Sequence, residues 1–458
     1  MVPHRWQLWL GGIALLGLAI RFGSVLGRPN RAPGGDGFYY YHAALLLVQG
    51  KGFINPFYYL GQNLHPVHTT VQTAQWPPLF VFVMAAPVVF GLKSYLVVRL
   101  WLCLIGALAV VAVGYVGKEI SNQRVGLIAA FLLAIYPNVW MSTEVGLSET
   151  LTPLLVALLL LAAYRFWKKP ELRYAIWAGV ALGFSMLGRD ELALLAVFIF
   201  LPLCIMAKPL AWLKRLGLLC AIAATALLII SPWVGYNLFR FHDPVFISSG
   251  LGITLTSTTC DATYFGDFAG SWNYECARAA PNDPNVDETV NGTRDQAYAW
   301  NYISSHFSEL PRVEYDRLGR TFGFFRPFQQ IRLDAMIETR PYRWVLIGLF
   351  GYYALLVLAV GGTVVLRKRK VLTFPLWAVA LDVVISTMIT FGNTRFRTSF
   401  EVSLVLLAAV SIDWFVANRR NEDQSTLDTY AHRPHEVESR KTSSHLSNAP
   451  TDPGNVVS

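Results

Sequence analysis

The chain alternates between long apolar runs and short polar turns. The runs near 95–117, 212–235 and 343–366 contain almost no charged residues. Each can cross a hydrocarbon core of about 30 Å as a helix, which takes roughly 20 residues. Further candidate spans lie at 6–26, 125–141, 149–164, 174–188, 192–207, 373–391 and 398–416. A membrane β-barrel would instead show short segments of alternating polarity. The pattern predicts an all-α polytopic membrane protein with about ten transmembrane helices.

The composition supports this prediction. The 458 residues are 54% hydrophobic and only 15% charged, whereas soluble proteins carry roughly 25% charged residues. The net charge of +9 would suit a nucleic-acid binder only if the basic residues formed one patch. Many of them lie in short turns between apolar runs, so we expect no nucleic-acid partner.

The distribution of basic residues predicts the orientation. The run 77–92 is short, begins with Pro77-Pro78 and contains Pro87, so we expect it at the membrane surface. With ten other spans and a cytoplasmic N-terminus, the basic turns face the cytoplasm, as the positive-inside rule requires. The run 6–26 then acts as an uncleaved signal anchor, and both termini are cytoplasmic. The inside turns hold Lys118 and Arg124, the basic residues of 165–173 and 208–215, and the run 367–370.

This topology divides the chain into a membrane domain, 1–417, and a polar tail, 418–458. The membrane domain contains two large extracytoplasmic segments, 27–94 and 236–340. The tail has too few apolar residues for a core and is expected to be disordered in the cytoplasm. In the second external segment, residues 296–324 predict an amphipathic helix broken near Pro311. Cys260 and Cys276 also lie there, in an oxidising compartment where they could form a disulfide.

An acidic residue stands just beyond the first span. Asp36 lies between glycines in GGDGFYYYH, and glycines allow backbone or substrate to come close to its carboxylate. Tyr40 and its neighbours suit an interfacial site or a sugar-stacking surface. The alternative is a solvated aspartate beside a belt of interfacial aromatic residues.

Further polar residues fall at later external turns. Glu144 and Glu149 lie in STEVGLSETL, and Arg189 lies in GRDEL. Glu149 could serve catalysis. Alternatively, Ser148 caps the next helix, and the positive end of the helix dipole merely stabilises the carboxylate of Glu149.

Two arginines mark the last external turn. Arg395 and Arg397 in GNTRFRTSFE could clamp a phosphate, because a guanidinium donates two parallel hydrogen bonds to phosphate oxygens. The alternative is anchoring to lipid headgroups. The sequence contains no Walker A loop, zinc-ligand spacing or GxSxG elbow, so we expect no metal and no cofactor, and leave dependence on a divalent cation open.

Taken in order, these motifs resemble a known family, the polytopic GT-C-fold glycosyltransferases related to protein O-mannosyltransferases and the lipid A aminoarabinose transferase. The resemblance to this glycosyltransferase family 39-like group covers most of residues 1–417. The phrases CDATYFG and FRPFQQ resemble uncharacterised actinobacterial members. The motifs that carry the family resemblance are GGDGFYY, the Trp76-Pro77-Pro78 segment, KEISNQRVG, SETL, GRDEL, SPWVGYNLFRFHDPVFISSG and GNTRFRTSFE.

The resemblance implies transfer of a sugar from a polyprenyl-phosphate donor on the extracytoplasmic face of the plasma membrane. The acceptor would be a protein, a lipid or a cell-envelope glycan, and membrane lipids would surround the enzyme. Asp36 would act as general base in a displacement that inverts the anomeric carbon. Arg395 and Arg397 would bind the donor phosphate. Glu149 would orient hydroxyl groups, and Glu144, Arg189 and Tyr40 are the remaining candidates for substrate binding.

Two departures limit what the resemblance implies. Tyr236 stands where related sequences often have arginine, and no Asp-x-Asp pair accompanies Asp36. The metal dependence of oligosaccharyltransferase relatives is therefore not expected here. Two other functions stay open: a transporter or flippase of lipid-linked intermediates, and a non-catalytic scaffold. Only Arg21 and Asp382 place charge well inside apolar runs, which favours a site at one face over a polar conduit.

Overall fold

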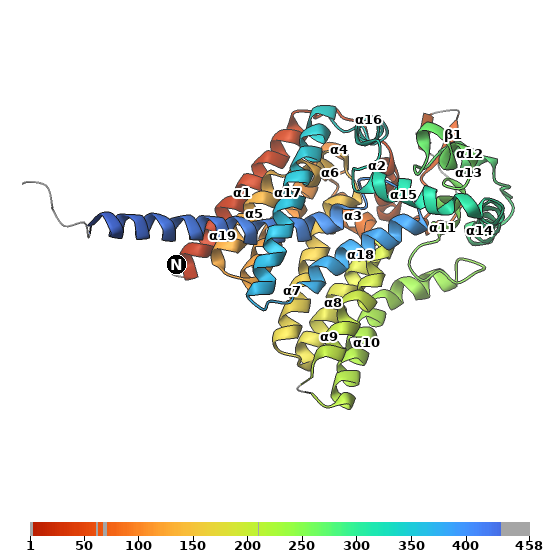
Figure 1. Ribbon diagram of the computed structural model, residues 1–458. Helices are drawn as coiled ribbons and strands as arrows, with labels where there is room; N and C mark the ends of the chain where they lie inside the picture. Colours follow the sequence, from red (N-terminus) through yellow and green to blue (C-terminus); the bar gives the residue numbers. More distant parts are fainter. Residues whose placement is uncertain (1–2, 61–62, 67–70, 209, 432–458) are drawn as a thin grey trace, which may run out of the picture. The chain divides into compact units, whose positions relative to one another are not determined.

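The structure, a computed structural model, describes residues 3–60, 63–66, 71–208 and 210–431 and consists almost entirely of helices (Figure 1). Among these residues, six helical segments are long and apolar enough to cross a membrane. The predicted class, an all-α multi-pass membrane protein, is confirmed. The six segments are α1 (Pro3–Leu26), α4 (Tyr95–Ile120), η1 (Ser148–Thr150) continued by α7 (Thr152–Lys168), α10 (Trp212–Leu238), α17 (Tyr342–Lys368) and α19 (Thr398–Ala431).

A seventh candidate span is sharply bent. Helices α5 (Gln123–Ile135) and α6 (Pro137–Val145) follow each other at an angle of 48°. The cause lies in the sequence, because a proline disfavours the helical conformation of the residue before it. Tyr136, the residue before Pro137, accordingly has an extended ψ of 116°.

Other apolar runs form shorter or irregular helices. Helix α3 (Leu79–Val89) has 11 residues, α8 (Leu172–Gly188) has 17 and α18 (Phe374–Ile389) has 16. The predicted span 192–207 is broken into a 3-10 helix, a π-helix and a short α-helix. The number of ten spans therefore stays a prediction. These three pieces are η2 (Asp190–Leu194), η3 (Ala196–Phe200) and α9 (Leu201–Met206).

The two large segments assigned to the outer face contain short elements. The first holds α2 (Asp36–Val48) and a small antiparallel hairpin that was not expected, β1 (Phe57–Leu60) with β2 (Asn63–Pro66). In the second, the helix expected over 296–324 is indeed broken just before Pro311. Cys260 and Cys276 are joined there, with Cα atoms 5.9 Å apart. The elements of this second segment are α11 (Leu251–Thr256), α12 (Asp261–Tyr264), η4 (Gly266–Phe268), α13 (Tyr274–Ala279), α14 (Glu288–Ser305), η5 (Phe307–Glu309), α15 (Leu310–Thr321) and α16 (Pro327–Ile337).

The chain divides into two compact units, residues 1–413 and residues 414–458. Helix α19 continues to Ala431 and so extends into the predicted tail, 418–458. Residues 432–458 lie outside the described residues, and the disorder expected there remains a prediction. The elements that form the candidate site all belong to the first unit.

An aromatic layer fixes α2 against α3. Tyr40 packs edge-on against Phe80 with ring centroids 4.9 Å apart, and Tyr39 packs against Trp76 at 4.3 Å. Burying one large apolar side chain contributes about 1.5–3 kcal/mol. At Gly37, an added Cβ would lie 2.5 Å from the carbonyl oxygen of Val145, so only glycine lets α2 pack this closely against the end of α6. These contacts hold the first residue of α2, Asp36, in place.

Candidate active site

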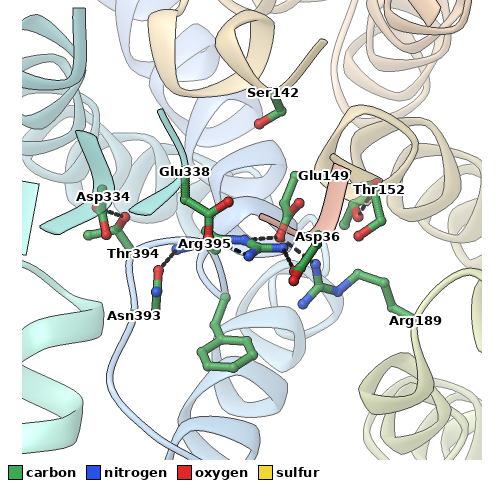
Figure 2. Close-up of polar contacts among 12 residues, drawn as sticks. Asp36, Ser142, Glu149, Thr152, Arg189, Asp334, Glu338, Asn393, Thr394 and Arg395 are labelled. Atoms are coloured by element: carbon green, nitrogen blue, oxygen red, sulfur yellow. Dashed lines mark hydrogen bonds and ion pairs between the residues drawn. The ribbon is translucent and has the colours of Figure 1, made fainter. Parts of the chain in front are cut away.

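Arg395 lies at the centre of a cluster of carboxylates (Figure 2). Its guanidinium forms ion pairs with Asp36 at 2.8 Å, Glu149 at 2.7 Å and Glu338 at 2.6 Å. Arg395 comes from the loop before α19, and its partners come from the start of α2, from η1 and from the residue after α16. Four segments that are distant in sequence thus meet at one side chain.

Arg189 extends the cluster on the other side of Glu149. Its Nη1 lies 2.9 Å from Glu149, and its Nε pairs with Glu191. Glu149 therefore accepts from two guanidinium groups through one oxygen. Of the residues predicted from the sequence, the structure brings together Asp36, Glu149, Arg189 and Arg395.

The three carboxylates on Arg395 differ in exposure. The side chain of Asp36 is 30% exposed, whereas those of Glu149 and Glu338 are 0% and 6% exposed. Oδ2 of Asp36 lies 2.8 Å from Nη2 of Arg395, so the ion pair holds an accessible carboxylate in place. Asp36 is therefore the member of this trio that a substrate can reach.

Burial and charge act in opposite directions on the ionisable groups of the cluster. Burial raises the pKa of Glu338 above its usual value, although Arg395 lowers it. Burial likewise raises the pKa of Glu191, against the effect of Arg189. For Arg395, burial alone would lower the pKa, but the carboxylates of Glu149 and Glu338 outweigh it and hold the pKa well above the usual value. Arg395 is thus a permanent cation at the centre of the site.

The backbone before Asp36 requires glycine. Gly35 precedes α2 with φ of 53° and ψ of −140°, a conformation that glycine adopts readily and that costs other residues about 1–3 kcal/mol. A Cβ at this position would also lie 3.4 Å from Oε2 of Glu338. Asp36 follows as the first residue of the helix, where the dipole favours a negative charge. The glycines on both sides of Asp36 thus serve packing and backbone geometry.

Tyr40 does not provide a sugar-stacking surface. Its ring is 3% exposed and packs between Trp76 and Phe80. Burial raises the pKa of its hydroxyl group, and the charge of Asp36 adds to this shift. Tyr40 therefore supports α2 from the core side, in contrast to the expected substrate contact.

Glu144 belongs to a different cluster. Its carboxylate accepts from Ser24 at 2.5 Å and pairs with Arg28 at 3.2 Å and with Arg31. Arg31 also donates to the carbonyl oxygen and, at 2.8 Å, to the hydroxyl of Thr339, the neighbour of Glu338. Glu144 is thus one step removed from the Arg395 cluster and makes no contact with Asp36.

Arg397 also lies apart from Arg395. It is buried, pairs with Glu401 at 2.9 Å and lies with its guanidinium 4.0 Å from the ring centre of Tyr352. The two arginines expected to clamp one phosphate therefore face different surroundings. Arg397 is committed to a buried ion pair within the first turns of α19.

Sequence reasoning missed Glu338 and Arg340. Both are buried, at 5% and 7% exposure, on either side of Thr339. The available signal was an acid and an arginine immediately before Pro341, where the second external segment re-enters an apolar run. Ser148 is not at the N-cap position of the next helix, because it is the first residue of η1, and Leu147 and Leu151 occupy the N-cap positions of η1 and α7.

Comparison with known proteins places the fold. The sequence profile of the family described as dolichyl-phosphate-mannose-protein mannosyltransferase matches residues 75–236. The oligosaccharyltransferase of Archaeoglobus fulgidus in the apo form aligns with 95% of this chain and 53% of its own, at 17% identity and a TM-score of 0.52. Its complex with zinc and sulfate aligns with 92% and 51% of the two chains, at 19% identity and a TM-score of 0.51. ArnT from Cupriavidus metallidurans bound to undecaprenyl phosphate aligns with 90% and 78%, at 12% identity and a TM-score of 0.43.

No curated protein sequence matches this chain. The chain spans about half the length of the archaeal oligosaccharyltransferase. The apolar helices and the structural match together show that this chain is a multi-pass membrane protein with the GT-C fold. Its resemblance to the superfamily of GT-C, protein-mannosyltransferase-like proteins is confirmed by the family profile together with the structural match.

Proposed function

We propose that this protein is a membrane glycosyltransferase that transfers a sugar from a polyprenyl-phosphate donor to a hydroxyl group of an acceptor. The acceptor is a protein, a lipid or a cell-envelope glycan. Transfer takes place on the extracytoplasmic face of the plasma membrane, with both chain termini in the cytoplasm. The GT-C fold and the family profile over 75–236 support this class of reaction.

The observation that carries the proposal is the setting of Asp36. Its carboxylate is accessible, and the ion pair between its Oδ2 and Arg395 fixes its position. A general base needs a carboxylate that is held in place and that the acceptor hydroxyl can reach. Asp36 meets both conditions, whereas Glu149 and Glu338 are buried.

In this mechanism, Oδ1 of Asp36 removes the proton of the acceptor hydroxyl as its oxygen attacks the anomeric carbon. The bond from that carbon to the donor phosphate breaks on the opposite side, so the configuration is inverted. Glu149 and Glu338 act through Arg395 and hold Asp36 in position, because they share its guanidinium. Arg189 fixes Glu149 from the other side.

The test is transfer by the purified full chain from a panel of polyprenyl-phosphate sugars to an added acceptor extract. Asp36→Asn keeps the size of the side chain and removes the base, and general-base catalysis typically contributes about 100- to 10,000-fold. We expect a rate loss in that range with an unchanged thermal unfolding temperature.

Asp267→Asn is the matched control. Asp267 is an external aspartate with 78% side-chain exposure that pairs only with Arg326 among the ion pairs of the described residues. This variant should transfer at the wild-type rate. Near-normal transfer by Asp36→Asn would show that Asp36 is not the base, and binding of the donor lipids without any transfer would favour a flippase.

A further inference from the structure

Arg340 lies beside the Arg395 cluster and has no part in the proposed mechanism. The residue is 7% exposed, and its Nε and Nη2 are buried without a hydrogen-bond partner in the described part of the chain. A guanidinium is always charged and carries five N–H donors. Burying such a group without hydrogen-bond acceptors is unfavourable, so Nε and Nη2 of Arg340 remain available to an acceptor that a ligand brings.

The other two arginines of the site are already committed. Arg395 binds three carboxylates, and Arg189 binds Glu149 (Figure 2). Arg189 also pairs with Glu191. A ligand anion would have to compete with these carboxylates for either guanidinium. Arg340 lies close enough to Glu338 to lower the pKa of that carboxyl group. It is therefore next to the cluster and has donors still available.

The backbone that carries Arg340 is held in an unfavourable conformation. Thr339 has φ of 54°, which is a genuine outlier for a β-branched residue. Arg31 holds this residue through its carbonyl oxygen and hydroxyl, and Glu144 in turn holds Arg31. Strained residues that the surrounding structure maintains cluster at ligand sites. Here the strain lies between Glu338, which binds Arg395, and Arg340.

We propose that Arg340 binds the phosphate of the lipid-linked donor, and that Arg395 is a positioning residue for the carboxylates. This assignment rests on the proposed function and replaces the phosphate clamp expected of Arg395 and Arg397. Arg31 and Glu144 are then positioning residues that hold the segment 338–340 in its strained form.

In the proposed transfer, one bond forms and one bond breaks at the anomeric carbon. The acceptor oxygen forms its bond to the anomeric carbon and gives its proton to Asp36. The bond between that carbon and the phosphate oxygen breaks, and its electron pair stays on the phosphate. The phosphate monoester gains a negative charge at that moment. A guanidinium that donates two parallel hydrogen bonds to phosphate oxygens stabilises this charge.

The test measures binding of a short-chain polyprenyl monophosphate, without any sugar, to the full chain in detergent micelles. Arg340→Gln should weaken binding by roughly 10- to 100-fold, the range for losing hydrogen bonds to a charged group. Arg340→Lys keeps the charge but loses the fork and should bind with intermediate affinity. Arg343→Ala is the control, because Arg343 is an exposed arginine three residues away that stacks on Trp344, and it should bind like wild type.

Three further ligands identify the source of the phosphate. Inorganic phosphate should compete weakly and in an Arg340-dependent manner, and the uncharged polyprenol should not depend on Arg340. Phosphatidic acid binding as tightly as polyprenyl phosphate would identify a general lipid-headgroup site and overturn the proposal. Wild-type affinity of Arg340→Gln for polyprenyl phosphate would overturn it as well, and so would failure of the wild type to bind.

Folding and function are separated by two readouts. Each variant is compared with wild type in thermal unfolding and size-exclusion elution. If Arg340→Gln does not fold, Arg340→Lys and a second variant, Arg31→Ala, carry the test, and wild-type affinity in both would refute the proposal. Arg340-dependent binding without transfer from any donor would sustain the phosphate site and reject the glycosyltransferase. Sugar transfer by the wild type, together with unchanged binding of polyprenyl phosphate by Arg340→Gln, would support the glycosyltransferase and reject the phosphate site at Arg340.

Discussion

Removing Arg395 tests whether the cluster depends on one cation. Arg395→Gln takes the guanidinium away from three carboxylates, of which Glu149 and Glu338 are almost completely buried. Breaking a buried ion pair by removing one partner costs about 3–5 kcal/mol, because the remaining charge is left buried and unpaired. The exposed pair with Asp36 adds only about 0–1 kcal/mol. We therefore expect a loss of about 3–5 kcal/mol at neutral pH.

The loss should depend on pH in a defined direction. Glu338 already has a raised pKa in the folded protein, and Arg395 is the main group that lowers it. Without Arg395 the pKa of Glu338 rises further. A carboxyl group whose pKa is higher in the folded state destabilises the fold as pH rises through its unfolded value toward the folded value. The difference between wild type and variant should therefore be larger at pH 8 than at pH 5.5, where Glu338 of the variant takes up a proton.

The assay is thermal unfolding in detergent at both pH values, with Arg326→Ala as the control. Arg326 pairs with Asp267 at a site where the two side chains are 37% and 78% exposed, so its removal should cost at most about 1 kcal/mol. The reasoning is refuted if Arg395→Gln is no less stable than this control. It is also refuted if the loss of stability is the same at both pH values.

Two further substitutions test the support of the site. Gly35→Ala should cost about 1–3 kcal/mol, because alanine resists a φ of 53° combined with a ψ of −140°. Gly12→Ala, with open space around the added Cβ inside α1, should be neutral or stabilising. A lower unfolding temperature in both variants, or in neither, would contradict this explanation. Cys260 and Cys276 are 16 residues apart. Reducing their disulfide should destabilise the second large segment, 236–340, by about 3 kcal/mol, because the unfolded chain regains the entropy that the closed loop removes. Comparing wild type with Cys260→Ser, each with and without reductant, checks this, and a reductant effect that persists in Cys260→Ser would rule out the disulfide as its cause.

Hydropathy predicted the helices best where apolar runs are long and uninterrupted. The runs 95–117, 212–235 and 343–366 became α4, α10 and α17 with little change in their bounds. Hydropathy did not predict that the run 192–207 is divided into a 3-10 helix, a π-helix and a short α-helix. An apolar composition reports that a segment can be surrounded by lipid or protein, but not that its backbone hydrogen bonds continue without a change of register.

For the site, sequence reasoning identified residues that stand at the ends of spans. Asp36, Glu149, Arg189 and Arg395 all lie at such ends, so the topology alone brings them to one face. Glu338 lies in an external segment of mixed polarity, where nothing in the local pattern separates a cluster residue from a solvated one. For Arg397 the local sequence pattern was misleading, because the structure places this side chain apart from Arg395. Its spacing of two from Arg395 suggested a shared ligand, but the start of α19 directs it to Glu401, one helical turn away.

The dependence on Arg395 has a consequence for biosynthesis. The chain emerges from the N-terminus, so Asp36, Glu149 and Glu338 are all made before the arginine that unites them. Until the segment before α19 is in place, Asp36, Glu149 and Glu338 lack their common counter-ion, and the earlier segments cannot form a complete site. We therefore expect a chain that stops before residue 395 to insert its first helices yet to be less compact around α2 and more accessible to proteases there. The segment that carries Arg395, just before α19, is therefore the part of the chain that completes the site.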